Sequence, residues 1–281
     1  MISLRYTSST EDYGLGTAYE RQAIYALLER WVGAPRSLVE GPVDGFAGLG
    51  GLHGLGCAAR GTQVTVVLPS ESALSAVREV YRRAGLARRL STVCADELPA
   101  DRWEVVLAFN ALPLARDWRG RLAELVSRAS RHVVLCVTHS GSYGARLRRV
   151  LRRLERSERR AELFDHESTD WRALEPELRK AGRIDARAWL DCPWWPDLFV
   201  EPGRGLLDAT LERLTSRPPS RPSSRFRYGP ESFPWVGGRP PAELRRALCL
   251  HPTFDGCPAL GPVFAHHRAY RIAPAARARD E

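Results

Sequence analysis

The sequence lacks any run of apolar residues long enough to cross a lipid bilayer. Residues 1–7 also lack the apolar segment of a secretory signal peptide. Apolar residues make up 44% of the chain and charged residues 27%, a balance typical of folded globular proteins and not of disordered ones. We therefore expect a globular, cytoplasmic protein without a membrane partner.

Lysine is nearly absent, and Lys180 is the only one in the sequence. Arginine therefore carries almost all of the positive charge behind the formal net charge of +9. Such a bias fits a genome-wide codon preference as well as a functional patch. The densest basic run, residues 146–160, keeps apolar residues at helical spacing, namely Leu147, Val150, Leu151 and Leu154. We expect its arginines to form the solvated face of a helix, and we do not expect a nucleic-acid partner.

Recognisable metal-binding spacings are missing as well. The six cysteines are scattered, so we expect reduced and mostly buried thiols. The zinc-binding residue types of the last third show no Cys-x-x-Cys or His-x₃-His spacing; they are Cys249, His251, Cys257, His266 and His267. A strand through residues 263–272 would send His266 and His267 to opposite faces. The sequence therefore predicts no metal site.

Strands and helices alternate along most of the chain. Short apolar runs rich in β-branched residues predict strands at 37–40, 64–68, 90–94, 104–109, 132–138 and 183–190. Amphipathic spacing predicts helices at 17–31, 52–60, 72–84, 119–130, 144–158 and 170–181. Strands that alternate with helices of this length form right-handed βαβ units. We expect an α/β fold with a doubly wound, mostly parallel sheet.

Residues 37–53 predict a strand, a glycine-rich turn and the start of a helix. A glycine-rich turn lets the backbone approach a ligand closely, because no Cβ stands in the way. The helix that follows presents free N–H groups and the positive end of its dipole. Nucleotide-like cofactors bind to α/β folds in this way, at the carboxyl ends of the strands. An isolated glycine cluster is equally compatible with a plain loop.

Four features follow one another in the order typical of a single family. Glu40 ends the first strand before the glycine turn, and the second strand at 64–68 follows it. Residues 93–99 place Asp96 before a Leu-Pro pair, and residues 103–113 end a strand at Asn110. Over residues 36 to 188 the chain resembles a class I S-adenosylmethionine-dependent methyltransferase. The resemblance implies a Rossmann-like fold and S-adenosylmethionine as the cofactor.

The resemblance also implies a cofactor site. It puts Asp96 by the adenine amino group and Asn110 beside the transferable methyl group. A carboxylate suits the contact with the amino group, because charge-assisted hydrogen bonds are strong. Asp96 could instead cap a turn, and Asn110 could satisfy a loop backbone. The methionine moiety would lie by the strand end and turn, at Glu40, Gly41, Asp44, Gly45 and Gly48.

The chain departs from the family pattern at two places. Pro42, Asp44 and Phe46 occupy positions where the family has glycines, and the turn is longer. Leu68 stands where the family has the carboxylate that binds the ribose diol. Asp44 or Glu71 could supply this acceptor instead. We therefore expect weaker cofactor binding than in members that keep the acid, and we expect Leu68→Asp to strengthen it.

Three regions are expected: an N-terminal helical segment (1–35), a Rossmann-like cofactor-binding domain (36–190) and a C-terminal substrate or insert region (191–281). The last region contains a Pro-rich loop at 217–225, a short helix at 241–250 and a returning last strand at 263–272. Trp194 and Trp195 would form a rigid aromatic surface for a ring-bearing substrate or a partner, or would plug the mouth of the domain.

The resemblance implies methyl transfer from S-adenosylmethionine to a small molecule that the sequence does not identify. No residue stands out as the catalytic base, although His53 and His139 are candidates, and residues 13–17 are a candidate lid. A non-catalytic binding or assembly protein that keeps the fold is the alternative that Leu68 favours. A nucleic-acid methyltransferase is less favoured, because residues 110–113 do not have the Asn/Asp-Pro-Pro-aromatic signature.

Overall fold

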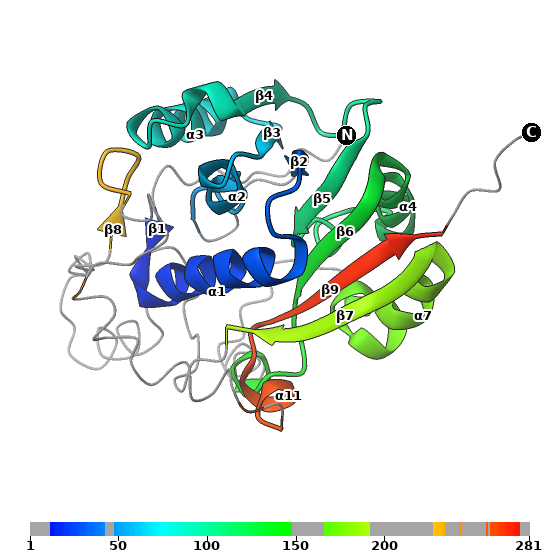
Figure 1. Cartoon of the computed structure of the whole chain (residues 1–281). Helices are drawn as coiled ribbons and strands as arrows, with labels where there is room; N and C mark the ends of the chain where they lie inside the picture. The colour runs from blue at the N-terminus through cyan, green and yellow to red at the C-terminus, as the bar shows by residue number, and fades with distance from the viewer. Residues whose placement is uncertain are drawn as a thin grey trace, which may run out of the picture.

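The computed structural model describes residues 12–42, 48–147, 166–191, 227–233, 242, 257 and 259–275 (Figure 1). Seven strands form one sheet in the order β4-β3-β2-β5-β6-β9-β7. These strands are β2 (Ser37–Glu40), β3 (Gln63–Leu68), β4 (Leu90–Cys94), β5 (Trp103–Phe109), β6 (Ala129–Thr138), β7 (Gly182–Leu190) and β9 (His267–Pro274). A separate two-stranded sheet pairs β1 (Asp12–Tyr13) with β8 (Arg227–Tyr228).

The direction of the strands defines two edges of the large sheet. Strands β2 to β6 run parallel to one another, and β9 runs antiparallel to both β6 and β7. Strand β7 therefore points the same way as β6. The carboxyl ends of six strands and the amino end of β9 lie at one edge, which we call the carboxyl edge. In doubly wound folds this edge is where ligands bind.

Helices cover both faces of the sheet (Figure 1). On one face lie α1 (Gly14–Val32), α2 (Leu55–Ala59) and α3 (Glu71–Arg83), and on the other lie α4 (Trp118–Arg128) and α7 (Trp171–Ala181). Successive strand residues alternate between the two cores, so that Val66 packs with α1 and α3 while Val67 packs with α4. The short helical segments are η1 (Ala87–Arg89), α6 (His166–Thr169) and α11 (Gly261–Phe264).

Polar caps fix the starts of the longer helices. The side chain of Ser70 accepts a hydrogen bond from the Ala73 N–H at the start of α3. Asp117 and Asp170 do the same at the starts of α4 and α7. Each cap satisfies a backbone donor that has no partner inside the helix. The strand-to-helix connections at the carboxyl edge are therefore well defined.

The expected doubly wound, mostly parallel sheet is confirmed. The expected last strand is partly wrong, because residues 261–264 form α11 and β9 begins only at His267. Pro262 lies in the first turn of α11, where its fixed φ fits a helix and its missing N–H costs nothing. Strand β9 pairs between β6 and β7, so the sheet continues beyond the expected boundary at residue 190.

Several expectations fall outside the described residues. These are the aromatic pair Trp194 and Trp195, the loop at 217–225, the helix at 241–250 and most of the arginine-rich run at 146–160. Among the helices of the described ranges, none is both long and apolar enough to cross a membrane.

Candidate functional site

The carboxyl edge gathers the residues that the sequence singled out. Glu40 ends β2, Leu68 ends β3, Asp96 follows β4 and Asn110 follows β5. Because these four strands are parallel, all four residues lie at the same edge. The polar residues that extend this row along the remaining strands are His139, Asp191 and His267.

Two glycines of the turn are required by close approach of the backbone. Gly41 has φ +132°, and a Cβ there would lie 2.1 Å from the carbonyl oxygen of Val67, so any other residue would clash with β3. A Cβ on Gly48 would lie 2.3 Å from Oδ1 of Asp12. The two ends of the turn thus pack against β3 and β1. Asp44 and Gly45 lie outside the described residues, and their roles stay predictions.

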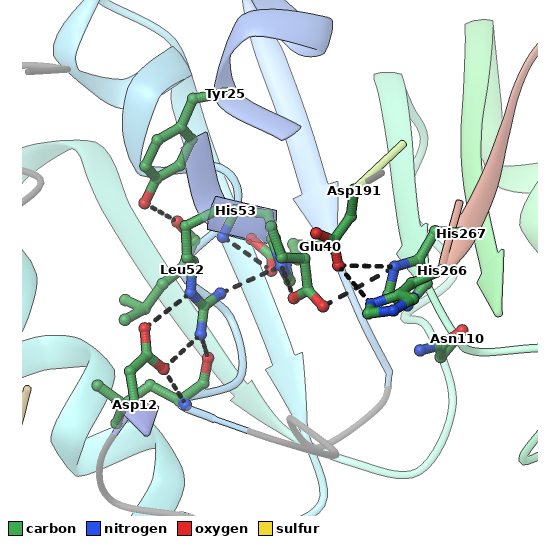
Figure 2. Close-up of polar contacts among 12 residues, drawn as sticks. Asp12, Tyr25, Glu40, Leu52, His53, Asn110, Asp191, His266 and His267 are labelled. Carbon is green, nitrogen blue, oxygen red and sulfur yellow. Dashed lines mark hydrogen bonds and ion pairs between the residues drawn. The ribbon is translucent and has the colours of Figure 1, made fainter. Parts of the chain in front are cut away.

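The carboxylate of Glu40 is buried and bonded to the far end of the same turn (Figure 2). Its Oε1 accepts from the backbone N–H of His53 at 3.1 Å and from Nδ1 of His53 at 2.8 Å, while Oε2 accepts from the Gly54 N–H at 2.7 Å. Burial by itself raises the pKa of Glu40, but His53 and the backbone donors lower it overall. Glu40 therefore holds the turn against α2 as an anion, and its proximity to a methionine moiety stays a prediction.

Arg21 of α1 joins the turn to the N-terminal segment. It donates from Nε and Nη2 to Asp12 at 3.0 and 2.9 Å and also to the carbonyl oxygen of Leu49. Asp12 accepts in turn from the Leu49 N–H at 2.7 Å. Nη1 of Arg21 lies 3.1 Å from Nε2 of His53, and because a guanidinium only donates, His53 accepts there and donates from Nδ1 to Glu40. These contacts fix the second half of the turn, at Leu49 and His53.

The residues expected at the ribose and the adenine differ in exposure. Leu68 is completely buried in the core cluster that also contains Val66 and Val77. Asp96 is exposed just beyond β4. Glu71, which could have replaced the missing acid, begins α3 and forms an ion pair with Arg78. A carboxylate is therefore presented at this end of the edge by Asp96, and the side chain of Leu68 contributes only packing.

Asn110 links the ends of two strands. Its Oδ1 accepts from the backbone N–H of Thr138 at 2.7 Å and from the Thr138 hydroxyl at 3.0 Å. The backbone of Asn110 has φ 52°, and Asp191 has φ 56°; among the described residues these are the non-glycine residues with positive φ. Such conformations cost energy and cluster at functional sites. The plainer role expected for Asn110, satisfying a loop backbone, accounts for its side-chain oxygen.

A second group of titratable side chains lies beside the turn (Figure 2). Glu20 of α1, Asp191 after β7 and His267 at the start of β9 each place one oxygen or nitrogen within 4.8 Å of the others. Nδ1 of His267 lies 3.9 Å from Glu20 Oε2 and 3.9 Å from Asp191 Oδ2. Nδ1 of His266 lies 3.0 Å from the same Asp191 oxygen. The expectation that the two histidines point to opposite faces is wrong, because β9 begins at His267 and His266 precedes it.

Burial controls the protonation of these groups. It lowers the pKa of His267 to about 3, and the neighbouring His266 acts in the same direction, so the His267 ring is neutral at pH 7. Burial likewise lowers the pKa of His139. Burial raises the pKa of Glu20, and the nearby Asp191 carboxylate adds to this increase. Glu20 therefore lies in surroundings that disfavour its negative charge.

Comparison with solved structures identifies the fold. Magnesium protoporphyrin IX methyltransferase from Synechocystis PCC 6803, solved with bound SAH, is 14% identical and matches with a TM-score of 0.50 over 63% of this chain and 79% of its own. The chain has the class I methyltransferase fold. No protein-family model matches the sequence, and no curated protein does so either.

Other structural matches are weaker. The StiE O-methyltransferase segment is 12% identical, with a TM-score of 0.47 over 91% of this chain and 74% of its own. Coclaurine N-methyltransferase, solved with N-methylheliamine and SAH, is 19% identical, with a TM-score of 0.37 over 42% of this chain. The match takes in only 36% of that chain.

The methyltransferase fold also brings together residues that the sequence did not single out as a group. Asp191 directly follows a strand, so the rule that polar residues at parallel strand ends share an edge could have found it. Glu20 gave no such signal, because it lies within a helix whose packing against the sheet edge depends on the whole fold. His267 is a metal-binding residue type, but no local spacing in the sequence links it to Glu20 or Asp191.

Proposed function

We propose that this protein transfers a methyl group from S-adenosylmethionine to a small molecule. The observation that carries the proposal is the glycine turn, fixed between Glu40 and His53 at the carboxyl edge of a sheet with the methyltransferase fold. The bound SAH in the Synechocystis neighbour supports the same cofactor here.

The residues of the carboxyl edge fit this cofactor in part. Gly41 and Gly48 keep the turn free of side chains where the backbone is crowded, and Asp96 offers an exposed carboxylate to the adenine amino group. Asn110 would lie beside the methyl group, and Asp44 and Gly45 would complete the turn. Leu68 does not fit a ribose diol, because it is buried and has no acceptor. When bound, S-adenosylmethionine supplies an electrophilic methyl group on its sulfonium.

The protein's own part in the reaction is alignment and exclusion of water. Both candidate bases are buried and already bonded: His53 contacts Glu40 and Arg21, and Nε2 of His139 lies 3.0 Å from the Pro262 carbonyl oxygen. These bonds suit a positioning role better than proton transfer. The sulfonium leaves as the neutral thioether of SAH, so the proposed reaction needs no general acid, and a proton released by the acceptor passes to water.

Calorimetric titration with S-adenosylmethionine and SAH tests the proposal. We expect the parent to bind both, and Asp96→Ala to weaken binding by about 10- to 100-fold, since a hydrogen bond to a charged group contributes about 1.5–3 kcal/mol. Asp101→Ala is the matched control, because Asp101 is an exposed carboxylate before β5, at the opposite edge of the sheet. We expect this control to bind like the parent.

A non-catalytic binding or assembly role is the alternative, and the buried Leu68 is the observation that favours it. This alternative predicts that the parent binds neither ligand at millimolar concentration. That result would leave the fold assignment intact and would reject the proposed function.

A further inference from the structure

Glu20, Asp191 and His267 converge from three separate elements. The distances of 3.9 Å from His267 Nδ1 to Glu20 Oε2 and to Asp191 Oδ2 are too long for hydrogen bonds. Atoms that bind one metal ion at about 2.0–2.2 Å lie roughly 3–4 Å from one another. Both 3.9 Å distances fall in this range, and all three atoms lie within 4.8 Å of one another, as ligands around a shared centre do.

Two of the three side chains carry buried atoms that lack a partner in the described part of the protein. Oδ1 of Asp191 and Nδ1 of His267 are fully buried and accept or donate no hydrogen bond. The two residues are only 2% and 7% exposed. Buried polar atoms are nearly always satisfied, so each of these two atoms points to a missing partner.

A cation satisfies this arrangement better than a water molecule does. Glu20 and Asp191 present carboxylate oxygens, and Nδ1 of His267 presents a lone pair when the ring proton is on Nε2. One water molecule can donate to only two of these three acceptors. A cation attracts all three and offsets the two negative charges. Among the described residues, no arginine or lysine forms a hydrogen bond or an ion pair with Asp191 or His267.

We propose that Glu20, Asp191 and His267 bind one divalent first-row transition-metal ion. Two carboxylate oxygens and one imidazole nitrogen suit Mn²⁺ or Zn²⁺. A neighbouring group holds one ligand in place, because Nδ1 of His266 donates to Asp191 Oδ2 at 3.0 Å. Outer partners of this kind orient metal ligands in known sites.

The position of the ion suggests a class of methyl acceptor, and this step rests on the proposed function. The ring centroids of Phe109 and His267 are 4.9 Å apart. The residue after Phe109 is Asn110, which the proposed function puts beside the methyl group. Three protein ligands leave further coordination positions open. An acceptor that carries a hydroxyl or carbonyl oxygen would bind there, at the same edge as the cofactor.

Electron paramagnetic resonance of Mn²⁺ tests the site in the full-length chain without any cofactor. The protein is freed of metal with EDTA, dialysed and titrated with Mn²⁺. We expect one bound ion per chain, and pulsed measurements should detect a directly coordinated histidine nitrogen. Asp191→Asn and His267→Gln should each weaken binding by at least about tenfold. His267→Gln should also remove the nitrogen signal.

Asp185→Asn is the matched control. Oδ2 of Asp185 lies 4.0 Å from Nδ1 of His132, which resembles the distances around His267. This pair has only one acid, and Oδ1 of that acid already forms an ion pair with Arg183 at 2.6 Å. This variant should bind Mn²⁺ like the parent. Circular dichroism of every variant separates lost binding from lost folding.

A parent protein that binds neither Mn²⁺ nor Zn²⁺ would overturn the proposal, and so would Asp191→Asn and His267→Gln variants that fold and bind like the parent. Mn²⁺ binding in a protein that binds neither S-adenosylmethionine nor SAH would support the metal site and reject only the proposed function.

Discussion

The side chain of Leu68 fills the end of β3, and none of its surface is exposed. A Cβ added to Gly51 would lie 3.5 Å from Cδ1 of Leu68, so the leucine packs directly beneath the exit of the glycine turn. A carboxylate at this position would be buried among Val66 and Val77. The substitution that the sequence suggested for stronger cofactor binding therefore acts first on stability.

We expect Leu68→Asp to lower the free energy of unfolding by about 3–5 kcal/mol, because it removes apolar contacts and buries an unpaired acid. Urea unfolding followed by circular dichroism measures this change. Leu68→Met conserves volume and should cost less than about 1.5 kcal/mol. A Leu68→Asp protein as stable as the parent, with tighter binding of S-adenosylmethionine, would contradict this prediction and favour the sequence-based one.

Helix α1 connects the glycine turn, the group formed by Glu20, Asp191 and His267, and the main core. Arg21 and Glu20 are neighbours in the sequence, yet Arg21 binds Asp12 and the turn while Glu20 faces Asp191 and His267. The apolar side of the same helix, including Ile24 and Leu28, packs into the core. A change in this helix should therefore affect the turn as well as stability.

Arg21→Met should cost about 3–5 kcal/mol of unfolding free energy, because it leaves the Asp12 carboxylate buried without its partner. The double variant Arg21→Met with Asp12→Asn should recover part of this loss, since it removes the unpaired charge. Urea unfolding measures both. Arg30→Met, at an exposed position of the same helix, should change stability by less than about 0.5 kcal/mol. Equal losses at positions 21 and 30 would show that the buried pair has no special role.

The proposed metal site joins segments that lie far apart in the sequence. Its ligands come from α1, the end of β7 and the start of β9, and β9 also lies between β6 and β7 in the sheet. An ion held by all three segments binds the folded state and not the unfolded chain. Metal binding is therefore coupled to the stability of the whole fold.

We expect Mn²⁺ at 100 times its dissociation constant to raise the free energy of unfolding by about 2.7 kcal/mol over the EDTA-treated protein. Thermal unfolding at increasing Mn²⁺ measures the effect as a rise in Tm. His267→Gln should show little rise, while Asp185→Asn should respond like the parent. A Tm that is the same with EDTA and with Mn²⁺ would speak against a site that involves all three segments.

Local patterns in the sequence were enough to locate most of the fold. The strands at 37–40 and 90–94 have the expected bounds, and α3 and α7 begin within one residue of theirs. Apolar periodicity, caps and glycines act over a few residues, so one chain reveals them. Because parallel strands bring their carboxyl ends together, the sequence also predicted that Glu40 and Asp96 share an edge.

Contacts between distant segments depended on the tertiary structure. No local spacing links Glu20 to Asp191 and His267; they meet because α1 packs at the carboxyl edge and β9 returns antiparallel between β6 and β7. Burial is likewise a property of the assembled fold. It packs Leu68 into the core and bonds Glu40 to the turn, and neither contact follows from the place of the residue in the chain.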